Sequence, residues 1–196
     1  MKISPTEKSA LIIVDVQNDF LSGGTLAVPN GDQVIEPLNK YIELFNKKGL
    51  PVFATRDWHP RNHVSFKERR GPWPPHCIQN TQGAEISKKL RLPPNVKIID
   101  KAFSLDRDSY SGFQETILDL ELRKLGIRRL FIGGLATDYC IKATVLDSLE
   151  LGFETVLLLD AVKGVDINPG DSENAIRTMI LSGSIAITLE DLVIDV

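Results

Sequence analysis

Residues 10–14 of the chain, Ala10-Leu11-Ile12-Ile13-Val14, form an uninterrupted run of aliphatic, mainly β-branched side chains. A strand with one face in water alternates apolar and polar residues, whereas a strand buried on both faces is apolar throughout. Strands of the second kind are typical of parallel sheets that helices cover on both sides. This run therefore predicts a central strand of an α/β fold.

Predicted strands and helices alternate along the rest of the chain. Further strands are expected at 51–55, 96–100, 128–132, 155–159 and 184–188, with helices within 30–49 and at 113–125, 137–151 and 171–181. Such alternation implies right-handed crossovers and a mostly parallel sheet. We therefore predict a single domain over residues 1–196, a three-layer, Rossmann-like α/β sandwich around a mostly parallel six-stranded sheet.

The composition argues against several classes of protein. The chain has a net charge of -3, with 42% hydrophobic and 25% charged residues and no basic run, so nucleic acid is not an expected partner. No apolar run approaches the ~18 residues of a membrane span, and the N-terminus lacks a secretory signal pattern. The two cysteines, Cys77 and Cys140, suit a reducing compartment, and we expect a cytoplasmic protein. Apolar helix faces that the sheet does not need predict self-association.

Reactive side chains follow several of the predicted strands. Asp15, Asp57 and Lys101 each come directly after a strand, and the turn 133–140 follows another. Because the carboxyl ends of parallel strands meet at one edge of the sheet, these groups are expected to converge there. Cys140 would lie in the first turn of a helix, where backbone N–H groups favour a thiolate.

Cys140 is the candidate nucleophile of this edge. A carboxylate at Asp15 could take the thiol proton and later deliver it to a leaving amine, and an ammonium at Lys101 would lower the thiol pKa. Each residue alone also has an ordinary explanation: a turn-capping Asp, a solvated Lys or a small buried Cys. The prediction of a catalytic site depends on their combination.

A second group of candidates lies in the irregular segment 56–83, which contains all three histidines and both tryptophans. Asp57, His59 and His76 could form a three-ligand site for a divalent metal such as zinc, with positions left open for water or substrate. Histidines that serve only loop packing and hydrogen bonding are the alternative. Such a metal could polarise or orient a ring nitrogen or carbonyl of a substrate.

Neighbouring side chains could complete this site. His63 and Glu68 could add a fourth ligand or a hydrogen bond to a ligand, although either could equally be exposed. Cys77 could ligate the metal, but a buried structural role is favoured. Trp73 and Phe20 could enclose a flat aromatic substrate, with ordinary core packing as the alternative.

Five motifs occur in an order that is typical of one family. They are Asp15-Val16-Gln17-Asn18-Asp19-Phe20; Asp57-Trp58-His59-Pro60 with His63 and Ser65-Phe66; Trp73-Pro74-Pro75-His76-Cys77-Ile78-Gln79; Tyr110-Ser111-Gly112-Phe113; and Gly134-Leu135-Ala136-Thr137-Asp138-Tyr139-Cys140. In these motifs the chain resembles the nicotinamidases of the isochorismatase-like cysteine hydrolases, from the first strand to about Asp160. The resemblance implies the isochorismatase-like hydrolase fold.

The resemblance also implies an activity, namely hydrolysis of nicotinamide, with pyrazinamide as a surrogate, to the acid and ammonia through a cysteine thioester. A role in NAD salvage follows from it. The implied site residues are the catalytic Asp15, Lys101 and Cys140 and the metal ligands Asp57, His59 and His76. The implied cofactor is one divalent metal ion, with zinc expected and iron or manganese as alternatives.

Further details are implied around Cys140. The family's cis peptide bond would fall at Leu135-Ala136, and the N–H groups of Ala136 and Cys140 would form an oxyanion hole. The expected substrate contacts are Phe20, Trp73, Leu135 and Tyr139. The sequence departs from the common family pattern after Lys101, where Ala102 replaces a frequent glycine, and in the loop that carries Asp106-Arg107-Asp108.

Two other functions are compatible with these residues. A related amidohydrolase acting on ureido or N-carbamoyl substrates would keep the Asp, Lys and Cys but generally lacks the metal ligands. A non-catalytic module that retains a metal site would leave Cys140 unreactive.

Overall fold

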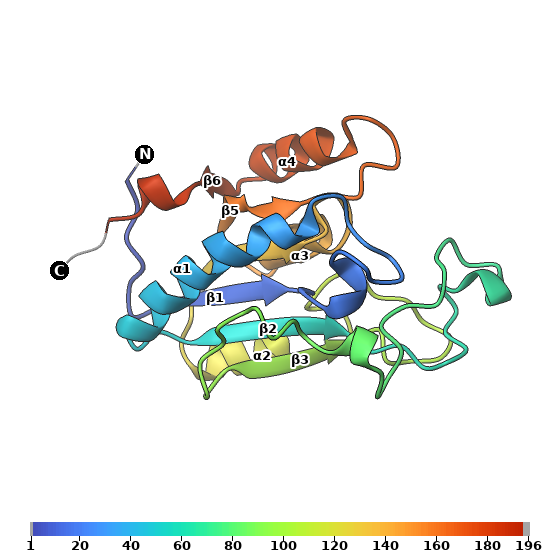
Figure 1. Cartoon of the computed structure of the whole chain (residues 1–196). Helices are drawn as coiled ribbons and strands as arrows, with labels where there is room; N and C mark the ends of the chain where they lie inside the picture. The colour runs from blue at the N-terminus through green and yellow to red at the C-terminus, as the bar shows by residue number, and fades with distance from the viewer. Residues whose placement is uncertain (1, 194–196) are drawn as a thin grey trace.

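The computed structural model describes residues 2–193 and is built on a parallel six-stranded sheet (Figure 1). The strands are β1 (Ser9–Val14), β2 (Val52–Asp57), β3 (Lys97–Lys101), β4 (Arg129–Leu135), β5 (Glu154–Lys163) and β6 (Ile185–Ile187). They lie in the order β3-β2-β1-β4-β5-β6, and every neighbouring pair is parallel. The apolar run at 10–14 belongs to β1, which is buried along its whole length in the middle of the sheet. The predicted fold class is confirmed.

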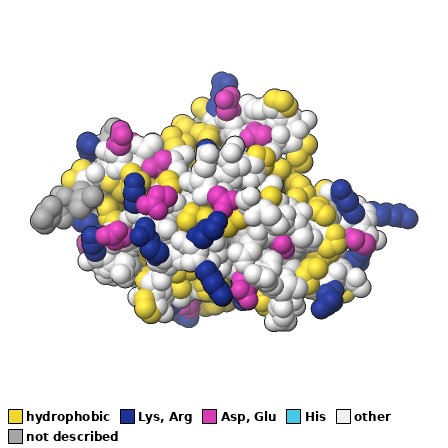
Figure 2. Space-filling view, in the orientation of Figure 1, with side chains coloured by type: hydrophobic (Ala, Val, Ile, Leu, Met, Phe, Trp, Pro, Cys, Tyr) yellow, Lys and Arg dark blue, Asp and Glu magenta, His cyan; other side chains and the backbone are white. Residues whose placement is uncertain are grey.

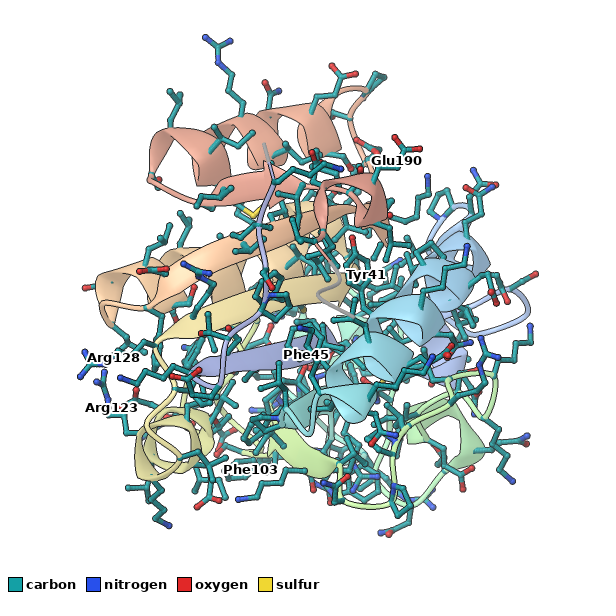
Figure 3. All side chains as sticks on the ribbon, turned by 90° about the vertical axis from the view of Figure 1, so that its left-hand side faces the viewer. Tyr41, Phe45, Phe103, Arg123, Arg128 and Glu190 are labelled. Atoms are coloured by element: carbon teal, nitrogen blue, oxygen red, sulfur yellow. The ribbon has the colours of Figure 1, made fainter. Side chains whose placement is uncertain are left out.

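Helices cover both faces of this sheet (Figure 1). They are α1 (Ile35–Lys47) on one face and α2 (Leu118–Lys124), α3 (Lys142–Glu150) and α4 (Asp171–Leu181) on the other. Tyr41 and Phe45 extend from α1 toward the sheet (Figure 3), and the Phe45 ring lies 5.3 Å from that of Phe131 in β4. On the opposite face, Leu122 of α2 and Val145 of α3 share a buried cluster. The sheet therefore separates two apolar layers.

The structure corrects the predicted helix at 113–125, because α2 begins only at Leu118. Glu115 has a φ of 57°, which is left-handed, and the Thr116 hydroxyl donates a hydrogen bond of 2.6 Å to the Gly112 carbonyl. This local bonding competes with helical bonding and delays the helix. The predicted helix at 137–151 begins with a π-helical turn, Thr137–Ile141, before α3.

Charges of both signs lie on the face of the molecule that Figure 2 draws, where acidic and basic side chains are interspersed. None of the helices in residues 2–193 is long and apolar enough to cross a membrane. Leu120 of α2 and Leu181 of α4 are exposed, and self-association stays a prediction.

Gly134 lies in β4 directly against Val14 of β1. Its φ is +127°, and a Cβ atom there would lie 2.1 Å from the Val14 carbonyl oxygen. We expect Gly134→Ala to lower the free energy of unfolding by roughly 2–3 kcal/mol, because the two central strands would have to separate. Gly152→Ala is the matched control: its φ is +83° with no atom within 4 Å. In the control the free energy of unfolding should fall by about 1 kcal/mol, the cost of placing an alanine in a left-handed conformation. Urea denaturation measures both, and equal losses would contradict the clash.

Candidate active site

The carboxyl ends of four strands meet at one edge of the sheet, at the arrowheads in Figure 1. Asp15 follows β1, Asp57 ends β2, Lys101 ends β3 and the turn that carries Cys140 follows β4. Asp15 and Lys101 are completely buried, and Cys140 is 6% exposed. The structure thus brings together the candidate residues that the sequence placed at separate strand ends.

Lys101 lies at the centre of this group. Its Nζ atom lies 3.0 Å from Asp15 Oδ2, 2.5 Å from Asp57 Oδ1, 3.2 Å from the Ser109 carbonyl oxygen and 3.5 Å from Cys140 Sγ. Burial alone would lower the pKa of Lys101, but the two carboxylates raise it well above its ordinary value. One fixed cation therefore compensates two buried anions and lies next to the sulfur.

Asp15 is the candidate proton acceptor of this group. Its φ of 51° turns the chain out of the sheet, and the Thr55 hydroxyl donates a 2.7 Å hydrogen bond to Oδ1. Burial raises the pKa of the Asp15 carboxyl to about 6, and the charge of Lys101 limits the rise. Within residues 2–193, Oδ2 has the ion-pair contact with Lys101 but no hydrogen bond that meets normal angular limits. At neutral pH Asp15 is thus mostly a carboxylate with an available oxygen.

The surroundings of Cys140 oppose the resting thiolate that its place in a helix turn predicts. Burial raises its pKa well above the ordinary value, and Lys101 opposes this only in part. A carboxylate oxygen of Asp15 lies within 4.8 Å of Sγ. Asp15 is therefore the candidate acceptor of the thiol proton.

The turn that presents Cys140 begins at a cis peptide bond between Leu135 and Ala136, where the resemblance placed one. The Ala136 carbonyl accepts hydrogen bonds of 3.1 Å from the N–H groups of Tyr139 and Ile141. These bonds close the turn around Cys140. The role of the Ala136 and Cys140 N–H groups as an oxyanion hole stays a prediction.

Asp57, His59 and His76 form a compact donor set, with potential ligand atoms within 4.8 Å of one another. His59 Nδ1 lies 3.1 Å from the His76 carbonyl oxygen, and His76 Nδ1 lies 2.8 Å from that of Pro74. Because a carbonyl oxygen only accepts, both Nδ1 atoms carry the proton, and each Nε2 presents a lone pair. This arrangement suits a divalent metal.

The charge states of these donors also suit a metal. Burial lowers the pKa of His59 to about 4 and lowers that of His76, so both rings are neutral at pH 7. Burial alone would raise the pKa of Asp57, but Lys101 brings it below its ordinary value. Two neutral imidazoles and a carboxylate are a ligand set that zinc accepts.

His63 and Glu68, the two additional ligand candidates, lie outside the donor set of Asp57, His59 and His76. The His63 ring stacks on that of His59 at 4.3 Å, and both of its nitrogens are engaged: Nδ1 with Ser65 Oγ at 2.7 Å and Nε2 with the Arg107 carbonyl at 2.9 Å. His63 can therefore support His59 but has no free lone pair. Glu68 is exposed and does not join the donor set.

A pocket connects the Cys140 thiol to Asp57 and His76 of the donor set. Its lining comprises Phe20, Leu26, Val28, Asp57, Trp73, His76, Tyr110, Ala136, Tyr139, Cys140 and Val165. Trp73 and Tyr139 pack edge to face at 5.0 Å, and Trp73 Nε1 donates a 3.0 Å hydrogen bond to the Tyr110 hydroxyl. The pocket is thus a largely apolar slot with Cys140 and His76 in its wall.

Comparison with known proteins decides the family. The sequence model of the isochorismatase domain matches residues 9–191. The chain belongs to the isochorismatase family.

Three relatives are similar to this chain over more than nine tenths of its length. Nicotinamidase from Escherichia coli (strain K12) is 40% identical, covering 93% of this chain and 95% of its own. The crystal structure of the pyrazinamidase of Pyrococcus horikoshii in complex with zinc has a TM-score of 0.89 at 50% identity and covers 93% and 99%. PnC1 from L. infantum in complex with nicotinate has a TM-score of 0.90 at 32% identity, covering 98% and 99%.

The structure of this isochorismatase-family chain also shows what sequence reasoning missed in the pocket. Tyr110 lines the pocket and begins the family motif Tyr110-Ser111-Gly112-Phe113, so this motif could have identified Tyr110 as a pocket residue. Leu26, Val28 and Val165 carried no signal, because their approach depends on loops folding over the sheet edge. Leu135, expected at the substrate, is 1% exposed and lies in the core, and the pocket lining begins at the next residue.

Two sequence features of this family member have structural explanations. Ala102, at the position of a frequent glycine, has a left-handed φ of 52°, a region that glycine adopts with less strain. Cys77 is completely buried outside the donor set, and burial raises the pKa of its thiol well above the ordinary value. This burial supports a structural role for Cys77.

Proposed function

We propose that this protein is a nicotinamidase, which hydrolyses nicotinamide, and pyrazinamide as a close analogue, to the acid and ammonia. The observation that carries the proposal is one pocket lined by both Cys140 and the metal donors Asp57 and His76. A reactive thiol and a site for a ring nitrogen then lie on two sides of one flat substrate. The relatives named as nicotinamidase and pyrazinamidase support the same activity. The reaction places the protein in NAD salvage.

The pocket explains how such a substrate would be held. Phe20, Trp73 and Tyr139 supply aromatic walls for a planar ring. A divalent ion, which we take to be zinc, would be held by Asp57, His59 and His76 and would orient the pyridine nitrogen, directly or through a water. The carboxamide would then face Cys140 and the N–H groups of Ala136 and Cys140.

Acylation begins with proton transfer from the Cys140 thiol to Asp15 as Sγ attacks the carboxamide carbon. The negative charge that forms on the amide oxygen is stabilised by the N–H groups of Ala136 and Cys140. Asp15 then donates its proton to the departing nitrogen, ammonia leaves, and a thioester remains. Lys101 stays protonated throughout and keeps Asp15 and the sulfur in place.

Deacylation reverses the direction of proton transfer. Asp15, a carboxylate again, takes a proton from a water that attacks the thioester carbonyl carbon. The same N–H groups hold the second oxyanion, and Asp15 returns the proton to the leaving Cys140 sulfur. The thiol is restored, and the acid gives up its remaining proton to solvent and leaves as nicotinate.

The activity is tested by incubating the purified, metal-loaded protein with nicotinamide and measuring ammonia and nicotinate. We expect benzamide, which has the same shape but lacks the ring nitrogen, to show a kcat/KM lower by at least on the order of 10²-fold. Removal of the metal by a chelator should suppress nicotinamide hydrolysis and so abolish the difference in kcat/KM between the two substrates. Added Zn²⁺ should restore nicotinamide hydrolysis.

The same assay separates the alternatives. Absence of ammonia release above that of a Cys140→Ala protein would show that the module is not catalytic. Faster hydrolysis of an N-carbamoyl amino acid than of nicotinamide, without a metal requirement, would identify the ureido-type amidohydrolase. The donor set in the pocket favours nicotinamide hydrolysis over both alternative functions.

A further inference from the structure

Gln17 is completely buried beside the active site, yet no catalytic step uses it. Its Oε1 atom accepts a 2.7 Å hydrogen bond from the Asp57 N–H group. Its Nε2 atom donates hydrogen bonds of 2.8 Å to the Asp57 carbonyl and 2.9 Å to the Ala84 carbonyl. One side-chain amide thus satisfies both backbone polar groups of Asp57.

The path of the chain explains why Asp57 needs this partner. The pairing of β1 with β2 ends at Val14 and Thr55, and Asp15 leaves the sheet with its positive φ. On its other side Asp57 is in register with Lys101 of β3. The last residue of β2 therefore loses its neighbour on the β1 side, where buried backbone groups require hydrogen bonds. The Gln17 amide takes the place of the missing strand.

The position of Asp57 matters to both halves of the site. Its Oδ1 atom lies 2.5 Å from Lys101 Nζ and 4.0 Å from His59 Nε2. A carboxylate that serves a fixed ammonium on one side and a metal on the other tolerates little displacement, because metal affinity depends on ligand geometry. The backbone at Asp57 must therefore be held from outside the site.

We propose that Gln17 is a positioning residue that fixes the backbone of Asp57 and so sets its carboxylate for metal binding. The inference rests on the proposed function, because it takes Asp57 as a metal ligand. It assigns a task to a residue of the first motif that neither binds substrate nor transfers a proton. The same short segment then supplies the catalytic base, Asp15, and the support of a metal ligand.

The test compares Gln17→Met, which keeps the length of the side chain without its polar atoms, with Asn39→Leu. Asn39 is the control in α1: it is 4% exposed, and its amide bonds two backbone groups, the Lys89 carbonyl at 3.0 Å and the Arg91 N–H group at 2.8 Å, where that of Gln17 bonds three. Both changes leave backbone groups unpaired, so thermal unfolding should show a similar loss of stability.

Metal binding separates the two variants. Each full-length protein is stripped of metal and titrated with Zn²⁺ against a chromophoric chelator. We expect Gln17→Met to bind Zn²⁺ 10- to 100-fold more weakly than wild type, about the effect of losing a support of a ligand, and Asn39→Leu to match wild type. At limiting Zn²⁺ the hydrolysis of nicotinamide by Gln17→Met should be low and should recover with excess Zn²⁺.

The outcomes distinguish this inference from the proposed function. A wild-type protein that bound no Zn²⁺ would overturn both. Wild-type binding with equal Zn²⁺ affinity in the two variants would overturn the role of Gln17 alone. Gln17→Leu is made in parallel; if both glutamine variants fail to fold while Asn39→Leu folds, the role of Gln17 is structural and the inference is wrong.

Discussion

Cys140→Ala should lower kcat for nicotinamide hydrolysis by on the order of 10⁴-fold or more, because no other group can form the thioester. The protein should fold normally, since the change removes one sulfur atom from the edge of the pocket and leaves the Asp15–Lys101 pair intact. Ammonia release at saturating nicotinamide measures the effect. Zn²⁺ binding by the variant should be unchanged, which separates loss of the nucleophile from loss of the site.

Cys77→Ala is the matched control for this substitution. Cys77 is the other buried thiol and does not line the pocket. Its removal should cost stability as a small core truncation does, about 1 kcal/mol, and leave kcat within a few-fold of wild type. A similar loss of activity in both variants would contradict the assignment of Cys140 as the nucleophile.

Lys101→Met is expected to lower the free energy of unfolding by about 3–5 kcal/mol, because it removes the cation shared by two buried carboxylates. Lys101 and Asp15 are completely buried, so solvent cannot compensate the charges that remain. Activity should be lost as well, since Asp15 would take up a proton and could no longer accept one from Cys140. Urea denaturation of metal-free protein at pH 7 measures the loss of stability.

The pH dependence of this loss has a defined sign. Burial already raises the pKa of Asp15 to about 6, above the ~3.9 of an unfolded chain, and loss of Lys101 raises it further. The folded variant then binds more protons than the unfolded chain, so its stability rises as the pH falls toward 5. The deficit relative to wild type should therefore be smaller at pH 5 than at pH 8. Adding Asp15→Asn to Lys101→Met should recover part of the stability at pH 8; no recovery would contradict the buried ion pair.

Much of the fold could be predicted from local sequence patterns. The apolar run at 10–14 is the central strand β1, and the alternation of strands and helices gives the parallel sheet. These predictions succeed because a strand buried on both faces gives a continuous apolar run, and a helix packed on a sheet gives apolar residues at helical spacing. The start of α2 was missed because the left-handed backbone at Glu115 does not change the pattern of apolar residues.

The candidate site shows the same division. Asp15, Asp57 and Lys101 could be placed at the sheet edge because each directly follows or ends a strand, a property of local sequence and topology. The contact between Asp57 and Lys101 was not foreseen, since it depends on the register of β2 with β3. Nor was the support from Gln17, which depends on where β1 leaves the sheet.

By itself, the sequence determined which reactive groups the chain carries and at which strand ends they lie. Only the tertiary structure decided how their pKa values shift: upward for Cys140 and for Asp15, whose pKa is about 6, and downward for His59 and His76. The physical reason is that a pKa depends on burial and on charges brought near from distant parts of the chain. At the turn 133–140 the sequence identified the candidate nucleophile, and the packing around it places Asp15 as the base that we propose for it.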